Sequence, residues 1–222
     1  GPKLRVGVMK EDVVVHKGDK ITFTTAEDIP GTAKRVYMNY KEFPNDVNPG
    51  EKILLDDGKL IFEVLETDKK TEVKAIVVQG GPLKSKKGVN LPNTKVSLPA
   101  LTQKDIKDAL FAIENQVDWI ALSFVRTSKD LEELQDLIAE NSDHKIPIID
   151  KIEKPEGVEN IDKIVAFCDG LMVARGDLGV EIPAEEVPLI QKKLNHRANT
   201  ARIPVIVATQ MMETMITSLT PT

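Results

Sequence analysis

Polar residues recur at a nearly constant interval in the second half of the chain, each near the end of a short apolar run. The four residues are Ser123, Lys151, Asp177 and Thr209, and they are separated by 28, 26 and 32 residues. Between the runs, apolar residues repeat with helical spacing, as in 106–113. A (β/α)8 barrel repeats about every 30 residues, and its chemistry lies at the carboxyl ends of its strands. The spacing therefore predicts parallel strands that bring these four side chains to one face.

An open, doubly wound α/β sheet alternates strands and helices in the same way. That fold usually carries a glycine-rich dinucleotide loop or a Walker loop, and the sequence contains neither motif. We therefore favour an α/β fold of the (β/α)8 TIM barrel type. About four βα units fit into residues 94–222, so this part is predicted to be a partial barrel.

Residues 5–93 show a different pattern. Short runs of β-forming residues, such as 60–64 and 72–78, alternate with turn signals about every ten residues. One such signal, Asp56-Asp57-Gly58, is typical of a hairpin turn. The pattern predicts a small barrel or sandwich. We interpret it as an all-β barrel inserted into a βα loop of the larger barrel, with residues 1–4 as the incoming connection.

The composition excludes several classes of partner. A net charge of -5 and a pI near 5.4 argue against a surface for nucleic acid or anionic membranes. Cys168 is the only cysteine, which excludes an intrachain disulfide and makes a reducing cytoplasm the default location. No apolar run approaches the roughly 18 residues of a spanning helix, and no signal peptide is recognisable. Because the chain opens without Met and stops without helix-ending chemistry, we expect both ends to be cut.

Three charged residues near the ends of two apolar runs carry the strongest functional signal. Lys151 and Glu153 are two residues apart, so in an extended strand they project to one side. Asp177 ends the next run. Two carboxylates beside a cation suit a hard metal ion that neutralises a phosphorylated substrate. The alternative is a structural ion pair, which we weigh lower because charges from two strands converge on the predicted catalytic face.

Two further segments are candidates for substrate contact. Gly176 and Asp177 open toward a predicted helical turn, so their backbone amides are able to bind a carboxylate or phosphate. The basic segment 84–88 leaves the β half and is either a solvated loop or a contact for nucleotide phosphates. Thr209, at the end of the last apolar run, is a candidate for contact with the reacting molecule.

At these positions the sequence resembles the pyruvate kinase family. Segment 148–157 is similar to the family's catalytic-lysine signature, and 172–183 is similar to its metal-site segment. Segment 208–215 matches the stretch that follows, and 85–92 matches the return from the family's inserted lid domain. Four motifs in order span nearly the whole chain.

The resemblance implies a glycolytic phosphotransferase. Such an enzyme transfers the phosphoryl group of phosphoenolpyruvate to ADP, giving pyruvate and ATP, with Mg²⁺ or Mn²⁺ and usually K⁺ as cofactors. Residues 5–93 would be the lid domain and residues 94–222 part of the catalytic barrel. The full-length enzyme would be a cytoplasmic homotetramer, with neither nucleic acid nor membrane as a partner.

The resemblance also implies roles for residues around the barrel site. Lys151 would stabilise the moving phosphoryl group and contact the substrate. Glu153 and Asp177 would hold the divalent metal. Ser123 and Phe124 would line the substrate pocket near Lys151.

The resemblance implies further roles for two backbone amides, for one threonine and for the lid. The amides of Gly176 and Asp177, together with Thr209, would position the substrate carboxylate. Thr209 would also act catalytically, in the water relay that protonates the enolate. Lys87 would reach the nucleotide from the lid.

Two departures from the family's pattern bear on function. The family has a small residue directly before the lysine, whereas this chain has Asp150. Strand alternation turns Asp150 away from Lys151 toward the helix layer, where an unpaired carboxylate is costly. The family's substrate-binding arginine and K⁺ ligands would precede Gly1, and its later strands are missing too. We therefore expect the 222-residue chain to be inactive alone.

Two other functions stay open at this point. One is a metal-dependent aldolase or lyase barrel that acts on pyruvate enolates, which also uses a glutamate and an aspartate on neighbouring strands. Lys86 and Lys87 in the inserted half argue against it, because an aldolase has no nucleotide to cover. The other is a nucleic-acid-binding module built on the β half, which the low aromatic content and negative charge disfavour.

Overall fold

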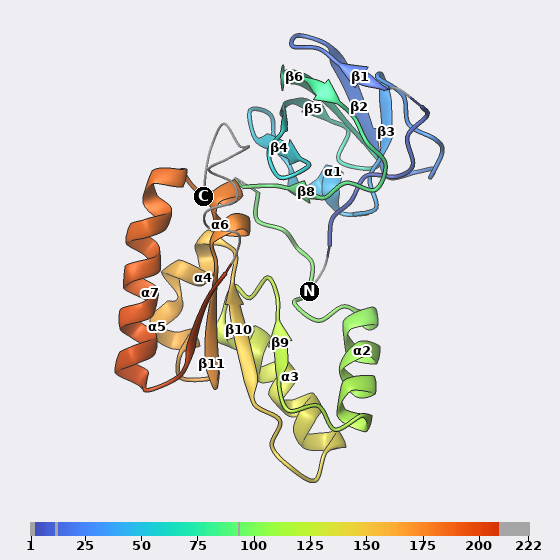
Figure 1. Cartoon of the computed structure of the whole chain (residues 1–222). Helices are drawn as coiled ribbons and strands as arrows, with labels where there is room; N and C mark the ends of the chain where they lie inside the picture. Colours follow the sequence, from blue (N-terminus) through green and yellow to red (C-terminus); the bar gives the residue numbers. More distant parts are fainter. Residues whose placement is uncertain (1–2, 12, 93, 209–222) are drawn as a thin grey trace. The chain divides into compact units, whose positions relative to one another are not determined.

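The computed structural model describes residues 3–11, 13–92 and 94–208. The chain forms two compact units (Figure 1). The first, Lys3–Ser97, is called the β unit, and the second, which begins at Leu98, is called the α/β unit. The sequence pattern changes at about residue 93, but the Ser97 amide donates to Asp46 Oδ2 at 2.8 Å within the β unit. This contact explains why the structural division follows Ser97.

A six-stranded sheet in the order β3-β2-β6-β5-β4-β8 makes up most of the β unit. Its neighbouring strands are antiparallel except for the β2–β3 pair. Residues 5 and 6 bridge both edges, since Arg5 pairs with Gly88 beside β8 and Val6 pairs with Met38 beside β3. The sheet therefore closes on itself, as expected for a small barrel. The elements are β1 (Val14–Val15), β2 (Lys20–Thr24), β3 (Arg35–Tyr37), α1 (Phe43–Asp46), β4 (Lys52–Leu55), β5 (Leu60–Thr67), β6 (Glu72–Gln79), β7 (Gly81–Pro82) and β8 (Val89–Asn90).

Three phenylalanines fill the centre of the β unit. Phe23, Phe43 and Phe62 are all fully buried. The Phe23 ring meets the other two edge to face, at centroid distances of 6.0 Å to Phe43 and 5.3 Å to Phe62. This geometry is the one that aromatic quadrupoles favour. The inward residues of the strands therefore converge on one aromatic cluster.

The turn between β4 and β5 confirms the predicted hairpin. Leu55 pairs with Leu60 across the antiparallel ladder. Asp56 and Asp57 have φ values of 51° and 58°, and Gly58 has φ 81°. Left-handed residues of this kind match the twist of the flanking strands.

The α/β unit contains four parallel strands among its described residues, in the order β9-β10-β11-β12. Each strand pairs with the next one in the sequence, and helices connect them (Figure 1). A doubly wound sheet would reverse its strand order at a switch point. The sequential order therefore confirms a partial barrel. The elements are α2 (Gln103–Glu114), β9 (Ile120–Leu122), α3 (Ser128–Asn141), β10 (Ile148–Ile152), α4 (Pro155–Glu159), α5 (Ile161–Ile164), β11 (Gly170–Ala174), α6 (Arg175–Glu181), a 3₁₀ turn (Ala184–Glu186), α7 (Val187–Ala201) and β12 (Val205–Ala208).

Capping boxes begin α2 and α3. Thr102 accepts a hydrogen bond from the Asp105 amide, and the Asp105 carboxylate accepts one from the Thr102 amide. Thr127 and Asp130 form the same box before α3. These reciprocal bonds satisfy amides that have no partner inside the helix.

A short break divides the helix that the sequence pattern places at 157–167. The structure has α4 and α5 instead, separated at Asn160, whose side-chain amide donates to the Arg126 carbonyl at 2.9 Å. Asn160 has φ -89° and ψ 8°, which interrupts the helix. Next to this contact, a Cβ on Gly157 would lie 2.8 Å from the Val125 carbonyl oxygen. The absence of a side chain at Gly157 therefore allows α4 to pack closely against the segment that follows β9.

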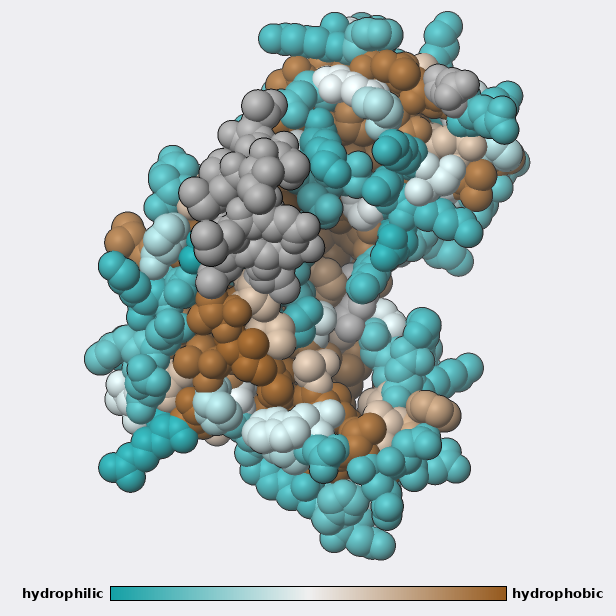
Figure 2. Space-filling model, in the orientation of Figure 1, coloured by the Kyte–Doolittle hydropathy of each residue, from teal (hydrophilic) through white to brown (hydrophobic). Residues whose placement is uncertain are grey.

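Hydrophobic residues reach the surface of the α/β unit, as Figure 2 shows for one face. Ile206 of β12 is 42% exposed. β12 is the last strand in the sheet order, and no strand in the described part of the chain pairs with its outer edge. An apolar strand with an open edge is what an unclosed barrel presents.

Candidate active site

The predicted site residues of the α/β unit gather at the carboxyl ends of β9, β10 and β11. Ser123 and Phe124 follow β9, and Lys151 is the penultimate residue of β10. Asp177 does not end a strand as the sequence pattern suggests, because β11 ends at Ala174 and Asp177 lies in the first turn of α6. Neighbouring parallel strands end at the same edge of their sheet, so the four residues share one face. Thr209 lies outside the described residues.

Lys151 and Glu153 project to one side, as their spacing predicts, and they form the ion pair that was the alternative to a metal site. Lys151 Nζ lies 2.5 Å from Glu153 Oε1 and donates to Ser123 Oγ at 3.1 Å. The Glu153 side chain is 2% exposed, whereas that of Lys151 is 24% exposed. The Lys151 ammonium group is therefore partly open to solvent. It binds Ser123 after β9 and Glu153 after β10.

The backbone at Phe124 is held in an unfavourable conformation next to this ion pair. Phe124 has φ 61°, in the left-handed region that a bulky residue rarely occupies. Its amide donates to Glu153 Oε2 at 3.1 Å. Strain of this kind persists where the surroundings enforce it, and it is common at functional sites. Phe124 therefore orients the second oxygen of Glu153 through its main chain, a role that residue type alone did not indicate.

The electrostatic environment of Glu153 is suited to a cation. Burial raises the pKa of Glu153, and the negative charge of Asp177 raises it further. The hydrogen bonds and charge of Lys151, together with the Phe124 amide, lower the pKa without cancelling the rise. The buried carboxylate of Glu153 therefore feels the negative charge of the exposed Asp177, and a bound cation would offset that charge.

These two carboxylates fit a Mg²⁺ or Mn²⁺ ion of the open type. Such ions take one or two protein carboxylates and leave the other positions to water and substrate phosphate. Among the described residues no group of three or more His, Cys, Asp and Glu side chains is arranged to enclose a metal. The donor set of Glu153 and Asp177 thus matches a metal that binds together with its substrate.

The first turn of α6 contributes backbone amides beside the carboxylates. Gly176 and Asp177 are the second and third residues of this helix. The first four amides of an α-helix have no acceptor within the helix. The amides predicted to hold a substrate carboxylate therefore belong to a turn whose donors are available for that purpose.

In the β unit, Lys87 contacts a carboxylate that the sequence pattern did not indicate as its partner. Lys87 Nζ lies 2.8 Å from Asp56 Oδ1, and Lys59 Nζ lies 3.5 Å from Asp56 Oδ2. Burial favours a raised pKa for Asp56, but Lys87 and Lys59 outweigh it and lower the pKa. Asp56 meets Lys87 because Leu55 of β4 pairs with Val89 of β8, and the Asp56 amide donates to the Gly88 carbonyl at 3.1 Å. Only that long-range pairing distinguishes Asp56 from an ordinary turn residue.

Asp150 faces the helix layer, as strand alternation predicts. It is fully buried, and neither carboxylate oxygen has a hydrogen-bond partner among the described residues. Burial, followed by the charges of Glu153 and Asp130, raises the pKa of Asp150 to about 8. At neutral pH the side chain is therefore largely a neutral acid. It is part of the core behind the site and does not line it.

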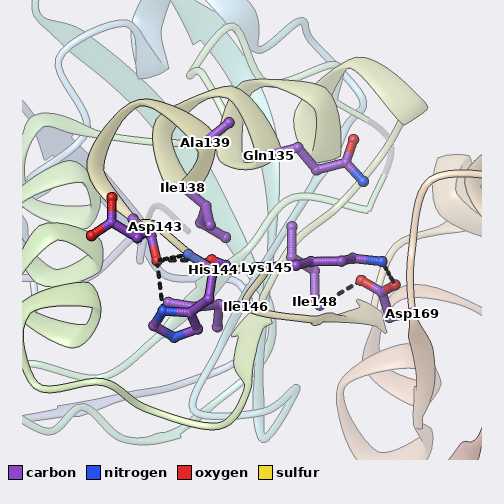
Figure 3. A pocket seen from close by; sticks show the side chains of 10 residues that line it. Gln135, Ile138, Ala139, Asp143, His144, Lys145, Ile146, Ile148 and Asp169 are labelled. Carbon is purple, nitrogen blue, oxygen red and sulfur yellow. Dashed lines mark hydrogen bonds and ion pairs between the residues drawn. The ribbon is translucent and has the colours of Figure 1, made fainter.

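A cavity of about 420 Å³ lies at the other end of β10 (Figure 3). Ile138, Ile146 and Ile148 contribute apolar lining, and an ion pair between Lys145 and Asp169 contributes charge. Barrel chemistry takes place at the carboxyl ends of strands, whereas Ile146 and Ile148 are at the amino end of β10. We therefore do not assign the reaction to this cavity.

Comparison with known proteins shows to which family the chain belongs. The family described as "Pyruvate kinase, barrel domain" matches residues 1–222. The chain is 47% identical to a pyruvate kinase of Geobacillus stearothermophilus over 100% of its own length and 38% of that relative. It is 44% identical to pyruvate kinases of Staphylococcus haemolyticus and Clostridium perfringens, of which it covers 37% and 47%. The chain thus spans less than half the length of these relatives. On this match, the chain belongs to the pyruvate kinase family.

Proposed function

We propose that the protein transfers the phosphoryl group of phosphoenolpyruvate to ADP, giving pyruvate and ATP. The observation that carries the proposal is the arrangement of Lys151, Glu153 and Asp177 at the carboxyl edge of the barrel sheet. Membership of the pyruvate kinase family supports the reaction class. Phosphoryl transfer depends mostly on positioning and charge stabilisation, and this edge offers the Lys151 cation beside the carboxylates of Glu153 and Asp177.

We propose the following roles around the transferred group. Lys151 Nζ stabilises negative charge on the phosphoryl oxygens, and its contact with Ser123 fixes where the amine points. Glu153 and Asp177 hold Mg²⁺ or Mn²⁺, which supplies charge neutralisation for the phosphate when bound. Phe124 lines the pocket near Lys151 and keeps Glu153 in place through its amide.

The remaining roles concern substrate placement and the nucleotide. The amides of Gly176 and Asp177, with Thr209, position the substrate carboxylate. Thr209 takes part in proton delivery to the enolate. Lys87 exchanges its partner Asp56 for nucleotide phosphate when ADP binds. K⁺ serves as a second cofactor.

We further propose a homotetrameric, cytoplasmic enzyme as the full-length form. Its partners would be the substrate and nucleotide pairs, with neither nucleic acid nor membrane. In the described part of the chain, no helix combines the length and the apolar character needed to cross a membrane.

Pyruvate formation that depends on ADP tests the reaction. We expect the full-length protein to release pyruvate from phosphoenolpyruvate only when ADP and a divalent metal are both present. A coupled assay that follows pyruvate and a second that follows ATP measure the two products. A metal-dependent aldolase or lyase that acts on pyruvate enolates is the rival, and pyruvate release without ADP would favour it.

The 222-residue chain alone is expected to give no measurable ATP. The described residues contribute four parallel strands, whereas a (β/α)8 barrel has eight and draws its catalytic residues from the ends of several of them. Circular dichroism of the purified chain provides the control that it is folded. Robust ATP formation by a folded sample of this chain would contradict the expectation.

A further inference from the structure

A buried ion pair lies one residue beyond the candidate metal ligand Glu153. Lys154, the residue before α4, binds Glu181, the last residue of α6. The Glu181 side chain is 1% exposed and that of Lys154 is 15% exposed. Burying such a pair costs a large desolvation free energy, so the pair need not stabilise the fold. Its presence therefore suggests a role other than stability.

The spacing of the four charged residues indicates that role. Glu153 and Lys154 are consecutive, while Asp177 and Glu181 are four residues apart in α6 and so share one face of it. The charge of Asp177 acts on Glu153, and Glu181 binds Lys154. The Lys154–Glu181 ion pair therefore joins the segment after β10 to α6 one helical turn from Asp177.

The helix that carries Asp177 needs such an anchor. α6 has seven residues, and no side chain in the described part of the chain caps its amino end. Helices this short are marginal without tertiary contacts. Leu178 holds the apolar side of α6 in the core. The Lys154–Glu181 ion pair holds the last residue of α6 to the segment that carries Glu153.

We propose that Lys154 and Glu181 are positioning residues that fix the separation of the Glu153 and Asp177 carboxylates and thereby set the affinity for the divalent cation. The inference rests on the proposed function, because it takes these two carboxylates as the metal ligands. Residues that orient metal ligands typically change metal affinity by roughly 10- to 100-fold when they are altered. We expect a loss of that size when the ion pair is removed.

The decisive variant removes both charges together. Lys154→Met with Glu181→Leu replaces the ion pair by apolar side chains of similar size, a change that usually preserves stability. Mn²⁺ alone is the probe, and its dissociation constant is measured by electron paramagnetic resonance on the full-length protein. We expect an unchanged unfolding midpoint in urea and roughly 10- to 100-fold weaker Mn²⁺ binding. Lys154→Arg, which keeps the charge, should retain most of the affinity.

Reference variants test the metal site separately from the positioning role of Lys154 and Glu181. Glu153→Gln and Asp177→Asn should each abolish Mn²⁺ binding, and if they do not, the proposed metal site is wrong. If they do and the double variant binds Mn²⁺ like the wild type, the positioning role alone is wrong. Lys145→Gln is the matched control, because it breaks the Lys145–Asp169 ion pair near the amino ends of β10 and β11 and should leave the affinity unchanged.

The metal dependence of activity tests the positioning role of Lys154 and Glu181 independently. If the pair acts through metal placement, the double variant should need more metal for half-maximal activity and recover most of its kcat at saturating metal. A fall in kcat that excess metal does not restore would overturn the proposal.

Discussion

Lys151→Ala in the full-length protein is expected to lower kcat by roughly 10²- to 10³-fold or more while metal binding stays largely intact. The Lys151 amine lies at the candidate site, where it contacts Glu153 and Ser123. Its charge counts most when the phosphoryl group is in transit, since that is when negative charge develops on the transferred oxygens. The loss should therefore appear in kcat more than in KM.

Metal binding should survive because the amine competes with the metal for Glu153. Removing Lys151 leaves burial and Asp177 to raise the pKa of Glu153 further, so protons compete better for the carboxylate in acid. Mn²⁺ affinity is therefore best compared at pH 8 and again at pH 6. We expect similar affinities for wild type and variant at pH 8, and weaker binding by the variant at pH 6.

Lys145→Ala provides the control for loss of one lysine from the same part of the fold. It removes an exposed amine near the other end of β10 and should leave kcat unchanged. An equal loss of Mn²⁺ affinity and of turnover in Lys151→Ala at pH 8 would assign Lys151 a structural role instead.

Asp150 is expected to produce the largest effect on stability. Its pKa is about 8 in the folded chain and 3.8 in its ordinary state. Between these values the unfolded chain has released a proton that the folded chain retains, so the free energy of unfolding falls as the pH rises. The stability contributed by the protonated form is fully present below pH 3.8 and is lost as the pH rises through about 8.

Two substitutions isolate this contribution. Asp150→Asn keeps the size but cannot ionise, and it should be more stable than the wild type by roughly 4 kcal/mol at pH 7 and by little near pH 4. Asp150→Ala also removes the buried polar atoms. Urea unfolding from pH 5 to pH 9 measures the difference, which should widen by about 1.4 kcal/mol per pH unit up to pH 8.

A surface aspartate provides the comparison for loss of one charge. Asp143 is exposed in the loop before β10, and Asp143→Asn should shift stability only slightly. A constant difference between wild type and Asp150→Asn across the pH range would show that Asp150 finds a partner or water on ionisation.

Local sequence patterns predicted the elements whose chemistry is local. Apolar periodicity at 106–113 indicated α2, and the pitch between polar strand ends indicated the parallel order of β9 to β12. The hairpin at Asp56 and Asp57 followed from residue type. The common side of Lys151 and Glu153 followed from strand alternation, whereas their ion pair had been the less favoured alternative.

The features that the sequence left hidden depend on distant contacts. The break at Asn160 requires the Arg126 carbonyl, and the strained backbone at Phe124 delivers an amide to a carboxylate 29 residues away. The sequence pattern placed Asp177 at a strand end, whereas β11 ends at Ala174 and Asp177 lies in α6. No local propensity encodes such partners, so they appear only when the strands are assembled.

The closure of the β unit has a consequence for domain insertion. Leu4 and Val89 share a backbone hydrogen bond of 3.0 Å, and Arg5 lies opposite Gly88, so the chain enters and leaves this barrel at one point. A domain whose ends meet can be inserted into another domain, or removed from it, without stretching the flanking chain. If the β unit is such an insertion, as the sequence pattern predicts, a linker of a few residues could replace it.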